Sequence, residues 1–286
     1  MQSDYQIVFQ SFRNGDFAST IFAIDPDGKN ERRISPWPGG RPGAMDPSVS
    51  KDSRRLVYTH SSTDGSHLTS VGIMNTDGTE ARVVIDKVAR RFRGGWATPA
   101  LSPGGNLVLF TSNMHGRDDI FVIQKDGSNK QPLTRNAGQN TWARWAPDGT
   151  QVLFSSTRDG NEEIYIMQAD GTRPKRLTLH REVDTYPTWS PDGKHIAFVS
   201  KRGDQWDIYT MSSTGENPMR ITDTETRERR PAWSPDGRMI AYVAAASEPE
   251  QEWFFSIFVM TIDGKYHREI TSGRYHNDMP SWTKRK

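Results

Sequence analysis

A pattern that returns every 44 residues limits what this chain can fold into. Trp145, Trp189 and Trp233 are 44 residues apart, and Leu101 precedes Trp145 by the same interval. Each interval holds four short runs rich in β-branched and aromatic residues, bounded by Gly, Pro, Asp or Ser, and these predict four strands joined by tight turns. Four antiparallel strands cannot bury both faces of their sheet alone, so the units must stack on one another.

The third predicted strand of the unit gives the number of copies. It occurs at residues 21–24, 71–74, 120–123, 164–167, 208–211 and 257–260. Longer intervals near both ends of the series indicate insertions at residues 87–96 and 247–253. A period in the forties with four strands per period is typical of a β-propeller. We therefore predict an all-β fold, a six-bladed β-propeller with four antiparallel strands per blade, as a single domain over residues 1–286.

The two ends of the chain match different strands of the unit. Residues 5–11 match the second strand, and residues 278–283 match a first strand. We predict that the C-terminal strand pairs with the N-terminal strand, so that one blade is shared between residues 5–35 and 278–284. Such pairing closes the ring and removes two free sheet edges.

Composition excludes several classes of function. The net charge of +2 over 286 residues gives no field that favours nucleic acid. The chain has no cysteine, which excludes disulfides and thiolate metal sites. No apolar run approaches the length of a membrane span. The motifs of common hydrolases, metalloproteases and nucleotide-binding enzymes do not occur. We expect a monomer that neither binds nucleic acid nor inserts into a membrane, and that uses no cofactor or metal.

The repeat resembles a known family. The segment from Asp184 to Thr222 begins D-T-Y-P-T-W-S-P-D-G and ends M-R-I-T. It is similar to the WD40-like (PD40) repeat of the six-bladed TolB-like propellers, and the resemblance covers essentially the whole chain. It implies the bacterial periplasm as the compartment, in a mature chain without its signal peptide, and an envelope lipoprotein such as Pal as the partner. A cytoplasmic location stays open.

Two faces of a propeller differ in their loops. One carries the repeated Ser-Pro-Asp-Gly and Asp-Gly turns, in which each residue has a local turn role. The other carries the loops between second and third strands and between blades, and these are irregular here. Irregular loops on a rigid scaffold are where function concentrates. We therefore predict partner binding by the blade-linking loops around the channel mouth, at Asp46, Arg93, Trp96, Trp142, Asp184, Tyr186, Arg229, Arg230, His276 and Asp278.

Some of these residues have plainer interpretations. We align Trp142 with Pro187, Pro231 and Pro280 of other blades, and a Trp in that place serves either a ligand or packing over the next blade. The run from Arg227 to Arg230 could hold an acidic partner or be a solvated charge run. The insertion at residues 247–254 could form a lip over the channel or a plain surface loop.

We predict a non-catalytic interaction module that binds a protein or peptide on this face. The alternative is a carbohydrate-active propeller, similar to a polysaccharide lyase or a lectin, with an aromatic or metal site at the same mouth. His60, His115, His180 and His276 map to that face, and imidazoles around a channel can bind a divalent metal.

Overall fold

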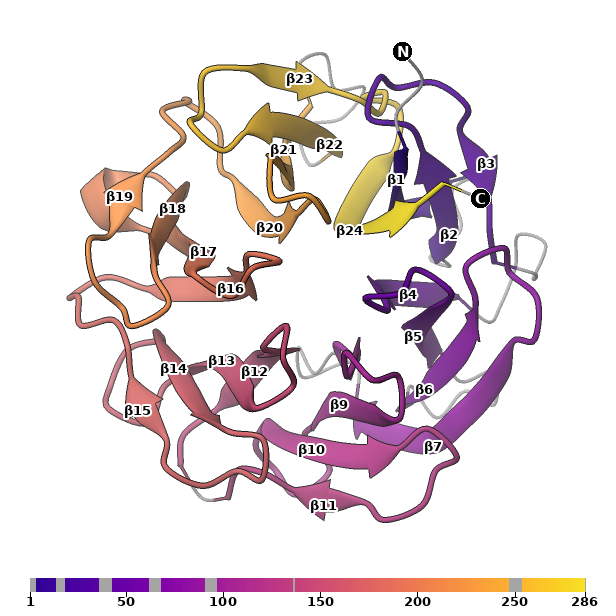
Figure 1. The fold of residues 1–286 in the computed structure, drawn as a ribbon, viewed down its shortest axis with the longest axis vertical. Coiled ribbons are helices and arrows are strands. Elements are labelled where there is room, and N and C mark those ends of the chain that lie inside the picture. Colours follow the sequence, from indigo (N-terminus) through magenta and orange to yellow (C-terminus); the bar gives the residue numbers. More distant parts are fainter. Residues whose placement is uncertain are drawn as a thin grey trace.

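Six four-stranded sheets form a ring around a central axis (Figure 1). The computed structural model describes residues 4–13, 19–35, 43–61, 68–90, 97–135, 137–246 and 254–285. Within each sheet every neighbouring pair of strands is antiparallel. The sequence prediction of an all-β, six-bladed propeller is therefore confirmed. The extension of one domain over all of residues 1–286 stays a prediction.

The blades follow one another in chain order, and the strands of each run outward from the axis in sequence. The first blade is completed by the chain end, in the order β24 (His276–Lys284), β1 (Tyr5–Phe12), β2 (Ser19–Ile24) and β3 (Arg32–Arg33). The second contains β4 (Ala44–Val49), β5 (Arg55–Ser61), β6 (Leu68–Asn75) and β7 (Arg82–Arg90). The third contains β8 (Ala100–Leu101), β9 (Leu107–Ser112), β10 (Asp119–Gln124) and β11 (Gln131–Pro132).

The last three blades repeat the unit most regularly. The fourth contains β12 (Asn140–Trp145), β13 (Gln151–Ser156), β14 (Glu163–Gln168) and β15 (Lys175–Arg176). The fifth contains β16 (Asp184–Trp189), β17 (His195–Ser200), β18 (Asp207–Ser212) and β19 (Met219–Arg220), with a short 3-10 turn at Arg202–Asp204. The sixth contains β20 (Arg229–Trp233), β21 (Met239–Ala245), β22 (Phe255–Thr261) and β23 (His267–Glu269).

The ring closes by pairing the two ends of the chain, as the sequence predicts. Strand β24 pairs antiparallel with β1, and Ile7 lies opposite Trp282. In Figure 1 the yellow C-terminal strand lies beside the indigo N-terminal strand in one blade. The interpretation of residues 87–96 as a plain insertion is only partly right. Strand β7 continues through Arg90, whereas the outer strands of the other blades have two or three residues.

The hydrophobic core lies between blades. Each of six buried clusters combines residues from two adjacent blades, as where Trp189 packs with Leu153 and Ile164. The repeated tryptophan is the wedge, and the Trp145 Nε1 donates to the Ala100 carbonyl of the preceding blade at 3.2 Å. This inter-blade packing explains the 44-residue spacing, because each sheet buries its faces only against its neighbours.

The repeated polar residues stabilise the turns. In the fifth blade the Ser190 hydroxyl donates to Asp192 at 2.6 Å and accepts from the His195 N–H at 2.9 Å. Gly193 follows with φ of 71°, a conformation that glycine adopts at little cost. At the other face, the Thr222 hydroxyl accepts the Ile208 N–H at 2.8 Å, where the third strand begins. These bonds recur in other blades, so much of the repeat motif serves local geometry.

Candidate functional site

The backbone of the innermost strands is irregular at the same place in the repeat. In five of these strands one residue has a positive φ of 51° to 56° and the strand shifts register across it, and in the third blade Thr98, just before β8, has a φ of 37°. Each of the six residues lies three positions before the residue equivalent to Trp145, which packs between two blades. All six line the central channel. We call them the bulge ring: Asp46, Thr98, Trp142, Tyr186, Arg230 and Met279.

The structure of the innermost strands differs from two expectations from the sequence. The eight described residues of the predicted site lie in the innermost strands rather than in blade-linking loops, because these strands begin several residues earlier than expected. The alignment of Trp142 with Pro187 is wrong by one position. Trp142 has the φ of Tyr186, so Ala143 is the residue that replaces the proline. Arg93 and Trp96 lie outside the described residues.

An arginine–aromatic cluster joins the bulge ring to the neighbouring strand ends. The rings of Trp142 and Tyr186 lie 4.5 Å apart, and the Arg230 guanidinium lies 5.2 Å and 5.6 Å from their centroids. Arg230 forms an ion pair with Asp278, whose carboxylate lies 3.7 Å from His276 Nε2. His276 also packs edge-on against the rings of Phe12 in blade one and Phe255 in blade six, and the Arg229 guanidinium lies over the Phe255 ring. These residues complete the cluster.

Asp184 does not join this cluster. Its side chain is fully buried and forms an ion pair with Arg202 at 2.7 Å. Asn140 holds the equivalent place in the fourth blade and accepts hydrogen bonds from Ser156 and Arg158. The aspartate of the repeat motif thus connects strands within its own blade.

The predicted run of charge at residues 227–230 is divided among three environments. Arg227 lies 4.6 Å from the Trp206 ring, and Arg229 lies 3.6 Å from the Phe255 ring. Glu228 is buried and accepts hydrogen bonds from Thr222 and Thr224. Burial raises the pKa of Glu228 to about 7, although those hydroxyls oppose the shift. Arg230 alone enters the channel, so these residues do not act as one basic patch.

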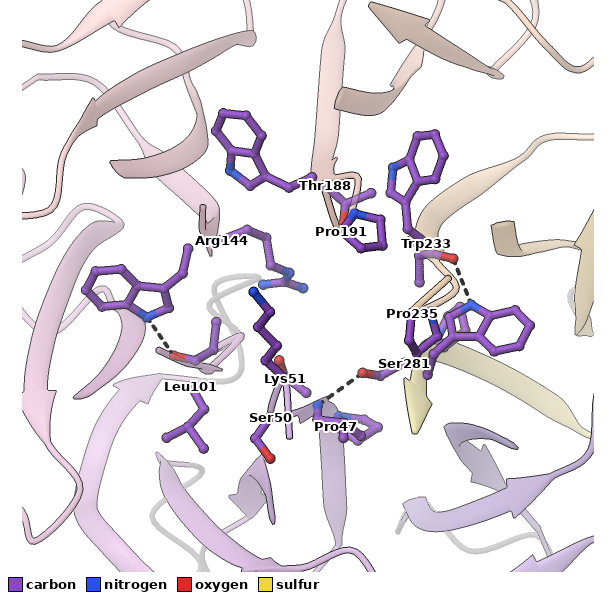
Figure 2. A pocket seen from close by; sticks show the side chains of 18 of the residues that line it. Pro47, Ser50, Lys51, Leu101, Arg144, Thr188, Pro191, Trp233, Pro235 and Ser281 are labelled. Carbon is purple, nitrogen blue, oxygen red and sulfur yellow. Dashed lines mark hydrogen bonds between the residues drawn. The ribbon is translucent and has the colours of Figure 1, made fainter. Parts of the chain in front are cut away.

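The channel contains a cavity with a volume of about 490 Å³. Its walls run from the bulge ring to the turns between first and second strands, including Pro103, Pro147, Pro191 and Pro235. Sequence reasoning assigned those turns a structural role, yet they border the cavity. Figure 2 shows Pro191 and Pro235 beside the channel together with Lys51 and Arg144, which point into its centre.

Sequence reasoning missed Arg144 and Lys51, although a signal was present. Two positions beyond the bulge, the other blades carry small residues, namely Ser48, Ala100, Thr188, Ala232 and Ser281. Arg144 is the exception. Lys51 similarly replaces the proline of the Ser-Pro-Asp-Gly turns, and its Nζ donates across the channel mouth to the Pro147 carbonyl at 3.0 Å. Comparison of the channel-facing positions blade by blade would have found both.

Burial governs the charges of the channel. Burial raises the pKa of Asp46 to about 6, although Arg230 opposes the shift. Burial lowers the pKa of Arg144 to about 10, and the Asp46 carboxylate partly offsets this effect. Burial also disfavours ionised Asp278, but the Arg230 guanidinium, a hydrogen bond from His276 and the Arg229 guanidinium together outweigh it and hold the pKa of that carboxyl below its usual range. At neutral pH the described part of the channel therefore keeps several buried charges.

The histidines of the carbohydrate-active alternative form no metal centre in the described part of the chain. In those residues no three His, Cys, Asp or Glu side chains are grouped so that they could hold a metal ion. His276 instead lies edge-on against Phe12 and Phe255.

No helix in the described ranges has the length and hydropathy needed to cross a bilayer.

Comparison with known proteins identifies relatives by sequence and by fold. The sequence matches the family described as the TolB beta propeller domain over residues 4–162 and 143–285. It is 28% identical over 133 residues to a TolB homolog of Chlorobaculum tepidum, which covers 46% of this chain and about a quarter (27%) of that relative.

Two solved structures share the fold. The crystal structure of TolB from Acinetobacter baumannii has a TM-score of 0.82 at 23% identity, covering 98% of this chain and 67% of that chain. A putative TolB from Agrobacterium tumefaciens has a TM-score of 0.72 at 19% identity, covering 99% and 100% of the two chains.

Proposed function

The chain belongs to the TolB β-propeller domain family, and from this premise we propose that it is a non-catalytic interaction module that binds a protein or peptide partner. The proposed site is the arginine–aromatic cluster, reached from the face that carries the blade-linking loops. The family resemblance supports the bacterial periplasm as the compartment and an envelope lipoprotein similar to Pal as the partner.

The observation that carries this proposal is the backbone of the bulge ring. A left-handed conformation costs an ordinary residue about 1–2 kcal/mol, and glycine would avoid that cost. Yet none of the six positions is glycine, and Thr98 is even β-branched. Residues with a strained backbone conformation tend to cluster at functional sites. The six side chains also differ from one another, which favours recognition of a specific partner over a packing role common to all blades.

The composition of the cluster supports the same function. Arginine and aromatic residues are enriched in the parts of protein interfaces that contribute most to affinity. Here Trp142, Tyr186, Arg229, Phe255 and His276 are each only partly buried, so a partner could cover them further. Their guanidinium–ring contacts hold them in place before binding, which lowers the entropy cost of association.

Capture followed by a binding titration tests this proposal. Immobilised protein is incubated with an extract of the source organism, and a retained protein is identified, purified and titrated by calorimetry. We expect Trp142→Ala and Arg229→Ala each to weaken binding about tenfold or more, the usual effect of losing an interface anchor. Arg230 is left intact, because its removal would strand the buried Asp278 carboxylate.

The control is Arg238→Ala, an arginine on the opposite, turn-bearing face. It should bind the partner as the wild type does. If the wild type retains no protein, or if the two cluster variants bind the purified partner unchanged, the cluster is not the partner site.

A further inference from the structure

The interior of the channel contains two opposite charges that do not meet. Asp46 lies on β4 and Arg144 on β12, and both line the same cavity. No ion pair joins them within the described structure, although each influences the pKa of the other. Long cationic side chains normally reach an accessible carboxylate, since a buried unpaired charge is costly. The separation of these two charges therefore requires an explanation.

The carboxylate of Asp46 forms no ion pair and no well-aligned hydrogen bond among the described residues, although the nearby Thr59 hydroxyl and Arg230 guanidinium both lower its pKa. The residue is 4% exposed, and neither of its side-chain oxygens accepts a hydrogen bond from the described residues. Its backbone N–H is held by the Gln10 Oε1 at 2.8 Å, so the residue is fixed in place. Buried polar groups are almost always satisfied, and one that is not indicates an absent partner or a functional role.

The guanidinium of Arg144 lacks a counterion. Among the described residues it forms no ion pair, and its Nη1 donates only to the carbonyl of the adjacent Ala143, at 2.9 Å. In Figure 2 it extends into the open centre of the channel. The corresponding residues of the other blades are small or short, and Arg144 lines the cavity that they leave. A guanidinium there can present two N–H groups to one carboxylate.

The cavity has a suitable size and entrance for a small ligand. Its volume of about 490 Å³ falls in the range of about 300–1,000 Å³ that is usual for small-molecule sites. The Lys51 ammonium at the mouth would attract an anionic group. Rings of Trp142 and Tyr186 and the prolines of the walls supply apolar surface between the charges.

We propose that the channel binds a small zwitterion of the amino-acid class, with its carboxylate on Arg144 and its ammonium on Asp46. Such a ligand pairs both charges at once, which neither an anion nor a cation alone can do. It would enter past Lys51, from the face opposite the proposed partner site. The inference does not rest on the partner-binding function.

A thermal-shift screen followed by calorimetry tests the proposal on the full chain. Each of the twenty proteinogenic L-amino acids is added at millimolar concentration, and the strongest stabiliser is then titrated. Its deaminated analogue keeps only the carboxylate, and its decarboxylated analogue keeps only the amine. We expect the amino acid to bind with a 1:1 stoichiometry and each analogue to bind about tenfold or more weakly, because each loses one charge-assisted hydrogen-bonded pair.

Two variants assign the two ends of the ligand. Arg144→Met should weaken both the amino acid and the deaminated analogue by about tenfold or more. Asp46→Asn should weaken the amino acid but not the deaminated analogue, since it removes a repulsive charge from that analogue's site. Arg238→Met, outside the channel, is the matched control and should change neither. Circular dichroism and melting temperature confirm that each variant folds.

Several results would overturn the proposal. Absence of stabilisation by all twenty amino acids is one. Binding that is unchanged in Arg144→Met is another, and equal effects of Asp46→Asn on the amino acid and the deaminated analogue would reduce the channel to a simple anion site. Arg229→Ala, which tests the partner site, should leave amino-acid binding unchanged, so that failure of one proposal is distinguishable from failure of the other.

Discussion

The buried carboxylate of Asp46 should make the protein less stable as pH rises. Its pKa is 3.8 in an unfolded chain and about 6 in the folded state. Between these values the folded state binds a proton that the unfolded state has released, so the free energy of unfolding falls with increasing pH. The stability that Asp46 contributes is complete below about pH 4 and is lost once pH has risen through 6.

The size of the effect follows from the pKa difference. A difference of about two pH units corresponds to about 3 kcal/mol, since one unit is equivalent to about 1.4 kcal/mol. Asparagine has nearly the same shape and stays neutral throughout. The stability of Asp46→Asn relative to the wild type should therefore increase by about 2 kcal/mol between pH 4 and pH 7, and the rest of the effect lies below pH 4.

Equilibrium urea unfolding at a series of pH values measures this difference. The quantity compared is the difference in unfolding free energy between variant and wild type, and only its dependence on pH is interpreted. Taking this difference cancels the titration of all other groups. Asp170→Asn is the contrasting control. Hydrogen bonds from Thr172 lower the pKa of the exposed Asp170, so the stability of Asp170→Asn relative to the wild type should change in the opposite direction below pH 4 and stay nearly flat from pH 4 to pH 7. A difference between Asp46→Asn and wild type that stays flat from pH 4 to pH 7 would refute the reasoning.

Three further predictions concern the scaffold. Ending the chain at Asn277 removes most of β24 and reopens the ring, so circular dichroism should show loss of the cooperative melting transition; a truncated chain that melts like the full one would contradict closure. Trp145→Ala empties the wedge between two blades and should lower the free energy of unfolding by about 3–5 kcal/mol in urea titrations, whereas a loss below 1 kcal/mol would show that the wedge is dispensable. Gly171→Ala should cost more than about 1 kcal/mol, because φ is 86° and the new Cβ would lie 2.7 Å from the Leu133 carbonyl oxygen; an unchanged unfolding midpoint would show that this turn relaxes freely.

The fold was largely predictable because each blade is specified locally. The recurring tryptophan, the Ser-Pro-Asp-Gly turn and the terminal threonine each have a role within one blade or against the next, as Ser190 and Thr222 show. Because these roles are repeated from blade to blade, the residues that fill them recur at a regular spacing in the sequence. Ring closure was predictable for the same reason, since the strands at the two chain ends complete one unit.

The site was predictable only in part. The residues Trp142, Tyr186, Arg230 and Asp278 were expected at one surface, and the structure brings them into contact. Their expected position in loops was wrong, and Asp184 proved to be part of its own blade's polar network. A left-handed residue in the middle of a strand leaves no fixed signature when its identity varies from aspartate to tryptophan.

The sequence by itself determined the number of blades, their strands and turns, and the closure of the ring. Periodic spacing encodes these features, because every unit must satisfy the same local and neighbouring contacts. Only the tertiary structure decided what the channel contains. The ring takes one bulged residue from each blade, and it brings Lys51 close to Pro147 and places Asp46 in one cavity with Arg144. Two features bring these side chains together. The bulge interrupts the alternation of side chains along the strand, and the closed ring places residues from different blades around one channel. Neither feature can be read from the sequence of a single repeat.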